Sequence, residues 1–218
     1  MTSSVSSYKA ILQERRWLSP RAFEITLDRP AAFHFQPGQY MGLYQGKEAR
    51  DYSPVSAPGD PDLRLCIRHV SDGRFSSALS EAAIGSQLTF TGPHGYFTFK
   101  PSQRPAVWVA TGSGIAPFCS MARSGVEGFM LLHGVSDPAD LYYAEIFQAA
   151  AGAYEPCLSA ANHTKAYFQG RVTDYIKNRL PSKPYDFYLC GRRDMVREVT
   201  YLVDELFPDS LVYSEIFY

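Results

Sequence analysis

The segment Ala106-Val-Trp-Val-Ala-Thr-Gly-Ser-Gly-Ile-Ala-Pro-Phe118 joins an apolar run to a glycine-rich turn. Its first five residues are apolar throughout, as expected of a strand in a parallel sheet that is covered on both faces. The turn Thr111-Gly-Ser-Gly114 then leads into a helical stretch, whose first backbone N–H groups suit a pyrophosphate. Pro117 stands where a third glycine would complete the dinucleotide-binding pattern, so a plain strand–helix turn stays open as the alternative.

The residues after this segment continue the alternation of strands and helices. Apolar strands are predicted at Gly128–His133 and Asp186–Cys190, and helices near Asp140–Ala151, Val172–Arg179 and Met195–Phe207. Uniformly apolar strands that alternate with helices indicate a parallel sheet with helices on both faces.

The residues before the segment show a different pattern, in which short strands are separated by turns. Ala22–Asp28 alternates at period two, as a half-buried strand does, and one helix is predicted at Ser76–Ala83. Regularly spaced short strands indicate an antiparallel barrel or sandwich. We therefore predict an antiparallel β domain, a barrel or a sandwich, in residues 1–102 and an α/β domain in residues 103–218, with the boundary near residues 101–105. Further strands are predicted at Tyr40–Tyr44, Leu63–Val70 and Gln87–Thr91, with turns at Pro37-Gly38 and Pro58-Gly59.

Composition excludes several classes of function. The chain has 218 residues, 45% of them hydrophobic, and a formal net charge of −1, which is typical of a globular protein and not of a nucleic-acid binder. Its four cysteines lie far apart, so we expect no zinc site and no iron–sulfur cluster. The N-terminus lacks the apolar core of a secretory leader, and the longest uncharged stretch contains two prolines and two glycines. We expect a cytoplasmic protein with free thiols and no membrane span.

Two stretches of the first half could bind a flat anionic ligand. In Arg50-Asp-Tyr-Ser53, placed at the start of a strand, Arg50 offers donors to a phosphate, Tyr52 a face for a ring, and Ser53 a small hydroxyl. An edge strand with a solvated arginine is the alternative. Gly73-Arg-Phe-Ser76 opens a helix and indicates an anion site, the alternative being that Ser76 is a simple N-cap.

The order of these motifs resembles that of the ferredoxin–NADP reductase superfamily of flavoproteins. Arg-x-Tyr-Ser comes first, followed by Leu65-Cys-Ile-Arg-His-Val70, Gly-x-x-Ser, Gly92-Pro-His-Gly-Tyr-Phe97, the Thr-Gly-Ser-Gly turn, Leu-His-Gly-Val-Ser136, Cys190-Gly-Arg-Arg-Asp-Met195 and a terminal Glu-x-Phe. The likeness begins near Phe35 and covers most of the chain.

The resemblance implies a barrel that holds FAD and a second domain that binds a nicotinamide dinucleotide. Arg50 would meet the FAD pyrophosphate, Tyr52 would lie on the isoalloxazine and Ser53 would face flavin N5. The remaining FAD contacts implied are Ile67, Arg68, His69, Gly73, Arg74, Phe75 and Ser76. Those implied for the nicotinamide dinucleotide are Thr111, Gly112, Gly114, Cys190, Gly191, Arg192 and Glu215. Of these residues, Ser53, Cys190 and Glu215 would act at the reacting rings, although Cys190 could equally be a plain core residue and is not expected to be a nucleophile.

The chain ends on Ser-Glu-Ile-Phe-Tyr218, which is unusually apolar for a terminus. In the plant-type members the terminal aromatic covers the flavin, and the pattern Glu-x-aromatic assigns that role to Phe217. Tyr218 would be an extra residue that stacks, extends over the adenine or frays. For Ile216 the preferred reading is a last strand at the edge of the sheet.

The choice between NADH and NADPH depends on few residues. Many NADPH-dependent members carry an arginine after the second strand of this domain, but here Asp137 stands in that stretch and would repel a 2′-phosphate. Arg192 and Arg193 could reach that phosphate instead. NADH is the preferred prediction.

The resemblance implies an enzyme that takes a hydride from NAD(P)H and passes single electrons to a ferredoxin, a flavodoxin or an oxygenase component. The C-x4-C-x2-C motif of a fused ferredoxin domain is absent from this sequence, so the electrons would leave directly from the flavin of a monomer. Two alternatives remain open: a flavin reductase that releases reduced free flavin, and a non-catalytic nucleotide-sensing subunit.

Overall fold

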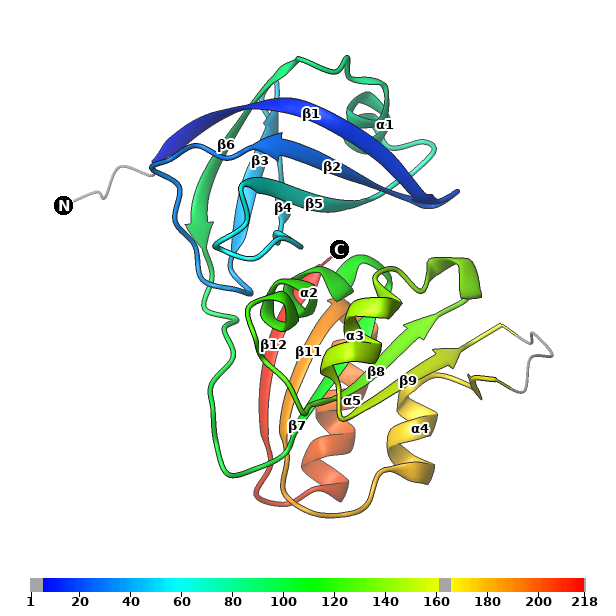
Figure 1. Cartoon of the computed structure of the whole chain (residues 1–218). Coiled ribbons are helices and arrows are strands. Elements are labelled where there is room, and N and C mark those ends of the chain that lie inside the picture. Colours follow the sequence, from blue (N-terminus) through cyan, green and yellow to red (C-terminus); the bar gives the residue numbers. More distant parts are fainter. Residues whose placement is uncertain (1–5, 161–165, 218) are drawn as a thin grey trace. The chain divides into compact units, whose positions relative to one another are not determined.

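A computed structural model describes residues 6–160 and 166–217. By their contacts the residues form two compact units, Met1–Thr98 with Ala116–Ser124, and Phe99–Ile115 with Gly125–Tyr218. The predicted fold class, an antiparallel barrel followed by a parallel α/β sheet, is confirmed. Figure 1 shows the elements of each unit.

The first unit is built on a six-stranded antiparallel sheet with the strand order β4-β3-β6-β1-β2-β5. A bridge between Pro54, just after β4, and Leu65 in β5 links its two edge strands, so the sheet closes into a barrel. The interior is filled by apolar side chains such as Phe23, Ile25 and Phe90. Its elements are β1 (Ser7–Ser19), β2 (Ala22–Asp28), β3 (Tyr40–Gln45), β4 (Glu48–Tyr52), β5 (Asp62–Arg68), α1 (Arg74–Glu81), β6 (Gln87–His94) and α2 (Ala116–Arg123).

Three local expectations for this unit are wrong. Arg50–Tyr52 lie at the end of β4 and not at the start of a strand, because Pro54 has no N–H to continue the ladder. Helix α1 begins at Arg74 with Gly73 as its N-cap, so Ser76 is an interior residue of the first turn. Strand β2 is not half-buried: its outward Glu24 is only 5% exposed and pairs with Arg16 at 3.2 Å.

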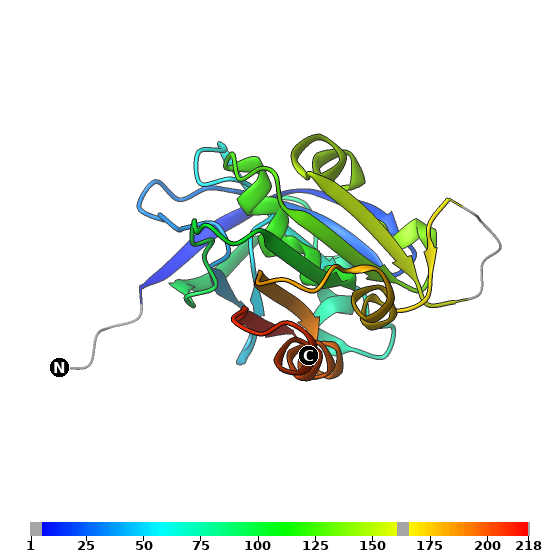
Figure 2. The same cartoon turned by 90° about the horizontal axis from the view of Figure 1, so that it is seen from below.

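The second unit is a parallel sheet with the strand order β10-β9-β8-β7-β11-β12. Figures 1 and 2 show α4 and α5 on one face of this sheet and α3 on the other. Its elements are β7 (Ala106–Thr111), the 3-10 turn η1 (Gly112–Ile115), β8 (Met130–Val135), the 3-10 turn η2 (Pro138–Asp140), α3 (Ala144–Ala150), β9 (Ala153–Leu158), β10 (Phe168–Gln169), α4 (Val172–Arg179), β11 (Asp186–Arg192), α5 (Arg193–Leu206) and β12 (Leu211–Phe217).

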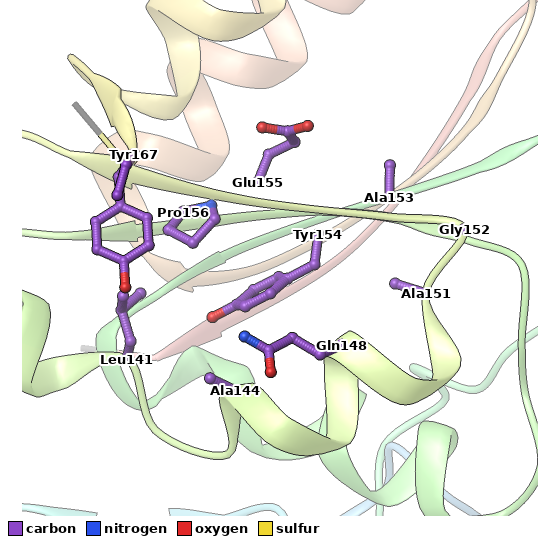
Figure 3. A pocket seen from close by; sticks show the side chains of 11 residues that line it. Leu141, Ala144, Gln148, Ala151, Gly152, Ala153, Tyr154, Glu155, Pro156 and Tyr167 are labelled. Atoms are coloured by element: carbon purple, nitrogen blue, oxygen red, sulfur yellow. The ribbon is translucent and has the colours of Figure 1, made fainter.

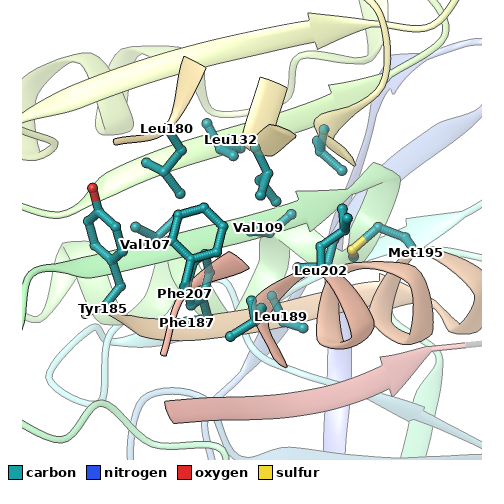
Figure 4. Close-up of a cluster of buried hydrophobic side chains, with 14 of the residues drawn as sticks. Val107, Val109, Leu132, Leu180, Tyr185, Phe187, Leu189, Met195, Leu202 and Phe207 are labelled. Atoms are coloured by element: carbon teal, nitrogen blue, oxygen red, sulfur yellow. The ribbon is translucent and has the colours of Figure 1, made fainter. Parts of the chain in front are cut away.

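A core of apolar side chains holds α4 and α5 against the sheet (Figure 4). Phe187 and Leu189 of β11 and Val107 and Val109 of β7 alternate onto this face, which they share with Phe207 after α5. Burying such side chains contributes about 1.5–3 kcal/mol each, so this core fixes the strand ends that carry the candidate site.

The helix predicted over residues 140–151 is shorter than expected. The chain forms η2 at Pro138–Asp140 and then α3 from Ala144, with Tyr143 between them at φ 60°. A left-handed residue cannot continue a helix, so the periodic sequence is broken there. The tail forms β12, which pairs with β11, and the edge-strand reading of Ile216 is confirmed.

None of the helices among the described residues is long and apolar enough to span a membrane. Within the same residues no cluster of His, Cys, Asp and Glu side chains could hold a metal ion.

Candidate functional site

Three of the predicted FAD residues come together beside α1. The Arg50 guanidinium lies 5.7 Å from the centroid of the Phe75 ring, and the Tyr52 and Phe75 rings are 6.3 Å apart. Burial raises the pKa of Tyr52 to about 12, partly offset by Arg50, so the phenol is neutral at physiological pH. Tyr52 therefore offers an uncharged ring face beside a cation that remains half exposed.

Ser53 follows directly and is only 2% exposed. Its Oγ has no hydrogen-bond partner within residues 6–160 and 166–217. A buried hydroxyl without a partner costs about 1–3 kcal/mol, and native proteins keep few of them. The arrangement fits a ligand whose polar atom would pair with this hydroxyl next to the Tyr52 ring.

The loop before α1 is tied to the helix by side-chain hydrogen bonds. Ser76 Oγ accepts from the N–H of Val70 at 3.0 Å, and Gly73 N–H donates to the Val70 carbonyl at 2.8 Å. Ser76 therefore shapes the loop through its side chain instead of capping the helix. Arg74 lies at the open side of this loop and pairs with Glu48 at 3.3 Å.

The end of β5 supplies the other predicted FAD residues. Ile67 is buried in the barrel, Arg68 is exposed and His69 is partly buried. The His69 N–H donates to the Arg21 carbonyl at 2.8 Å, which fixes this end of β5 against the β1–β2 turn.

In the second unit a glycine cradle forms where β7 and β11 end. A Cβ on Gly114 would lie 2.4 Å from the Cys190 carbonyl oxygen. Gly191 has φ +137°, and a Cβ there would lie 2.2 Å from Thr111 Oγ1. Thr111 Oγ1 also accepts from the Arg192 N–H at 3.1 Å. The two backbones approach more closely than any side chain would allow, as a dinucleotide cradle requires.

Cys190 and Glu215 occupy paired positions on β11 and β12. Cys190 is fully buried, and this burial, followed by the nearby Glu215, raises the pKa of its thiol well above the ordinary value. The thiolate is the nucleophilic form of cysteine, so a thiol that stays protonated is a poor nucleophile. Phe217 belongs to β12 by its backbone. The contact expected of Tyr218 lies outside the described residues.

The sequence did not reveal that α4 packs against β8 beside the cradle. A Cβ on Gly134 would lie 3.0 Å from Val172 Cγ1, at the start of α4, and 3.1 Å from Thr111 Cγ2. The first turn of α4 therefore lies against the end of β8. No local pattern marks Val172, because its neighbours at the cradle come from strands far away in the sequence.

A cavity of about 380 Å³ lies between α3 and β9, on the face where Tyr154 and Gln148 point toward each other (Figure 3). Tyr154 also reaches the interior, where its hydroxyl is 3.1 Å from Nδ1 of the buried His133. His133 Nε2 has no hydrogen-bond partner in the described part of the chain.

We expect His133 to make the fold sensitive to acid. Burial lowers its pKa from 6.5 to about 4, partly offset by Asp140. The unfolded chain therefore binds the proton more readily, and the stability that neutral His133 contributes is lost as the pH falls from about 6.5 to about 4. This group alone should lower the free energy of unfolding by about 3 kcal/mol across that window.

Urea unfolding of the native chain and of His133→Gln at pH 7 and pH 4 measures the effect. Glutamine keeps a hydrogen-bonding group near Tyr154 but does not titrate, so its stability should fall less. Equal losses in the two proteins would contradict the prediction.

Comparison with known proteins finds one known domain in each half of the chain. Residues 9–99 match the oxidoreductase FAD-binding domain, and residues 108–200 match the oxidoreductase NAD-binding domain. A ferredoxin–NADP reductase B from Sorangium cellulosum is 31% identical over 215 residues, which cover 87% of this chain and 88% of that protein. This chain belongs to the ferredoxin–NADP reductase superfamily.

Other members of the superfamily serve oxygenases. The xylene/toluene monooxygenase electron transfer component of Pseudomonas putida is 33% identical, and the toluate 1,2-dioxygenase electron transfer component of the same species is 30% identical. Each match covers 89% of this chain but only 60% and 62% of those proteins, so the chain spans about three fifths of their length. A ferredoxin NADP+ reductase from Neisseria gonorrhoeae, solved with FAD and NADP, has the same fold, with a TM-score of 0.83 at 22% identity over 97% of this chain and 99% of that one.

FAD and a nicotinamide dinucleotide are the cofactors of this reductase superfamily, and the residues present fit both. The buried Ser53 hydroxyl without a partner among the described residues fits a polar flavin edge. The glycine turn Gly112–Ile115 at the end of β7 fits a pyrophosphate, which backbone N–H groups can bind.

Proposed function

We propose that this chain takes reducing equivalents from NADH through bound FAD and passes electrons singly to a separate acceptor, namely a ferredoxin, a flavodoxin or an oxygenase component. Residues 1–102 would hold FAD and residues 103–218 the nicotinamide dinucleotide. The observation that carries the proposal is that one chain has two candidate binding sites. One is at Tyr52 and Ser53, where β4 ends, and the other is the close approach of Thr111 and Gly191. The electron transfer components among the relatives support the class of acceptor.

Bound FAD would supply the redox chemistry, because a flavin accepts a hydride and releases electrons one at a time. The residues of the chain bind and orient. Neutral Tyr52 offers a ring face, the Ser53 hydroxyl donates to a polar atom at the ring edge, and Arg50 neutralises phosphate charge. Because the Ser53 Oγ is buried, its hydrogen bond would be shielded from competing water.

The second unit would hold the dinucleotide through its backbone. Gly112 and Gly114 let the chain turn closely at the end of β7, while the Thr111 hydroxyl is oriented by the Arg192 N–H. Glu215 is paired with Cys190 on the neighbouring strand. Its carboxylate would suit a nicotinamide ring, which carries positive charge when oxidised.

Anaerobic mixing with NADH tests the proposal. We expect purified protein that is yellow, keeps FAD through desalting, and loses its flavin absorbance on mixing with NADH. A colourless protein that releases its flavin would instead indicate a flavin reductase. An unbleached flavin band would contradict both activities and favour a nucleotide-sensing subunit. Reconstitution with candidate ferredoxins, flavodoxins and oxygenase components then identifies the acceptor.

We expect kcat/KM to be at least about tenfold higher for NADH than for NADPH, because like charges brought together on binding cost several kcal/mol. Asp137 lies just after β8, where its carboxylate accepts from the Ala139 N–H at 3.0 Å. Asp137→Asn keeps an acceptor for that N–H but removes the negative charge. It should therefore raise kcat/KM for NADPH and bring the two kcat/KM values closer together. Preference of the native chain for NADPH would contradict the prediction and point to Arg192 or Arg193.

A further inference from the structure

Trp17 is a large aromatic residue that packs against two other rings and is still half exposed. It lies near the end of β1 and is 49% exposed, whereas Trp108 is fully buried. Its ring centroid is 5.2 Å from that of Phe23 and 5.2 Å from that of His69, the latter edge-on at 79°. The indole is therefore packed against two rings and still has half of its surface accessible to a flat ligand ring.

Backbone pairing holds the chain at Trp17 in place. Trp17 is paired with Phe23 across β1 and β2, and Ala22 is paired with Arg68 across β2 and β5. The hydrogen bond from His69 N–H to the Arg21 carbonyl ties the third segment to the same corner. Figure 1 shows the β1–β2 turn and the end of β5 at the same end of the barrel. A ligand that stacks there would lose little conformational freedom of the protein.

Exposure of one aromatic is common and by itself indicates nothing. The position of Trp17 relative to the FAD residues is the second observation. Tyr52 lies beside Phe75 in α1, and Ser76, the next residue, is hydrogen-bonded to Val70. Val70 follows His69, which contacts Trp17. A continuous series of neighbours thus runs within one unit from the ring of Tyr52, past the first turn of α1, to the indole.

FAD has the same order of groups along its length: isoalloxazine, ribityl chain, pyrophosphate, ribose and adenine. With the isoalloxazine on Tyr52 and the pyrophosphate near the first turn of α1, the adenine would reach the corner occupied by Trp17. Arg68 is exposed at this corner and would add positive charge near the diphosphate.

We propose that the Trp17 indole, packed against His69, is the stacking platform for the adenine of FAD, and that it makes the barrel prefer FAD to FMN. The inference rests on the proposed FAD site in residues 1–102. Aromatic side chains stack on bases through the π face, so the platform would not depend on hydrogen bonds to the base. FMN has the same isoalloxazine but no adenine and would gain nothing from Trp17.

Dissociation constants of the apoprotein for FAD and for FMN test the platform. Trp17→Ala should weaken FAD binding about tenfold or more while leaving FMN binding unchanged. Trp17→Phe keeps a ring and should retain most of the FAD affinity. Tyr201→Ala, an exposed aromatic on α5 in the other unit, is the matched control and should change neither constant.

A second readout does not depend on how well Trp17→Ala folds. ADP carries the adenine and the diphosphate but does not absorb tryptophan emission. ADP should therefore quench the fluorescence of the native apoprotein in a saturable manner, and should quench Trp17→Phe, which keeps Trp108, much less.

The outcomes separate the inference from the function on which it rests. Equal weakening of FAD and FMN in Trp17→Ala, or ADP quenching that persists in Trp17→Phe, would overturn the platform while leaving the flavin site intact. Unchanged FAD affinity in Trp17→Ala would also overturn it. If the native apoprotein bound neither flavin, the proposed function itself would fail, and the platform with it.

Discussion

Gly114→Ala is expected to reduce the rate of flavin reduction by NADH about a hundredfold or more, because small displacements at a reacting site have costs of this order. The added methyl group would lie 2.4 Å from the Cys190 carbonyl oxygen and 2.6 Å from the Gly191 Cα. Both are backbone atoms of β11, which is held by pairing with β7 and β12. Relief of the clash must therefore move the turn or part the strands, and either change distorts the cradle.

Stopped-flow reduction by NADH, compared with chemical reduction by dithionite, measures the effect. FAD affinity and dithionite reduction should be nearly unchanged, because Tyr52, Ser53 and α1 belong to the other unit. Gly112→Ala is the matched control: Gly112 has φ +55°, but a Cβ there would meet nothing within 4 Å. It would carry the conformational cost of a left-handed residue, about 1–2 kcal/mol, without the clash. Equal effects of the two substitutions would show that strain, and not close approach, explains the glycines.

The sequence predicted the architecture well because the two halves differ in periodicity. Ala22–Asp28 alternates like a strand of a closed antiparallel sheet, whereas Val107–Val109 is apolar on both faces. The predicted bounds of β2 and α4 agree with the structure. One error arose because a single residue, Tyr143, interrupts the periodic pattern before α3. Another arose at Glu24, which is polar and was expected to be exposed but is covered by tertiary contacts.

The candidate site could be predicted only as separate motifs. Gly114 lies close to Cys190, and Val172 lies close to Gly134. Both contacts depend on the order of the strands in the sheet, which cannot be read from the periodicity of the sequence. The role of Ser76 also depends on a loop conformation, since its hydroxyl binds Val70 six residues earlier. Trp17 was missed for the same reason: its neighbour His69 is 52 residues away in the sequence and is brought close only by β2.

Ser53→Ala is expected to slow flavin reduction by NADH about a hundredfold, which is the usual cost of removing one preorganised hydrogen-bond donor from a reacting group. FAD binding should change little, because in the proposed site Tyr52, Arg50 and α1 would supply most of the contact. The apoprotein should lose no stability and could gain some, because the Ser53 hydroxyl is buried without a partner among the described residues. A slower reaction without a loss of apoprotein stability is the result expected of a hydroxyl that pairs with the bound ligand and has no role in the apoprotein.

Ser56→Ala is the matched control for this result. Ser56 is also fully buried in the first unit, but its Oγ accepts from the Arg64 N–H at 3.1 Å. Its removal leaves that N–H unpaired and should lower the apoprotein's free energy of unfolding by about 1–3 kcal/mol while sparing the rate of flavin reduction. Urea unfolding of the apoproteins and anaerobic stopped-flow kinetics of the holoproteins, each for the native chain and the two variants, give the six numbers needed. If Ser53→Ala instead destabilised the apoprotein and reduced its flavin at the native rate, the hydroxyl would be structural, and hydride acceptance would depend on Tyr52 and the cofactor alone.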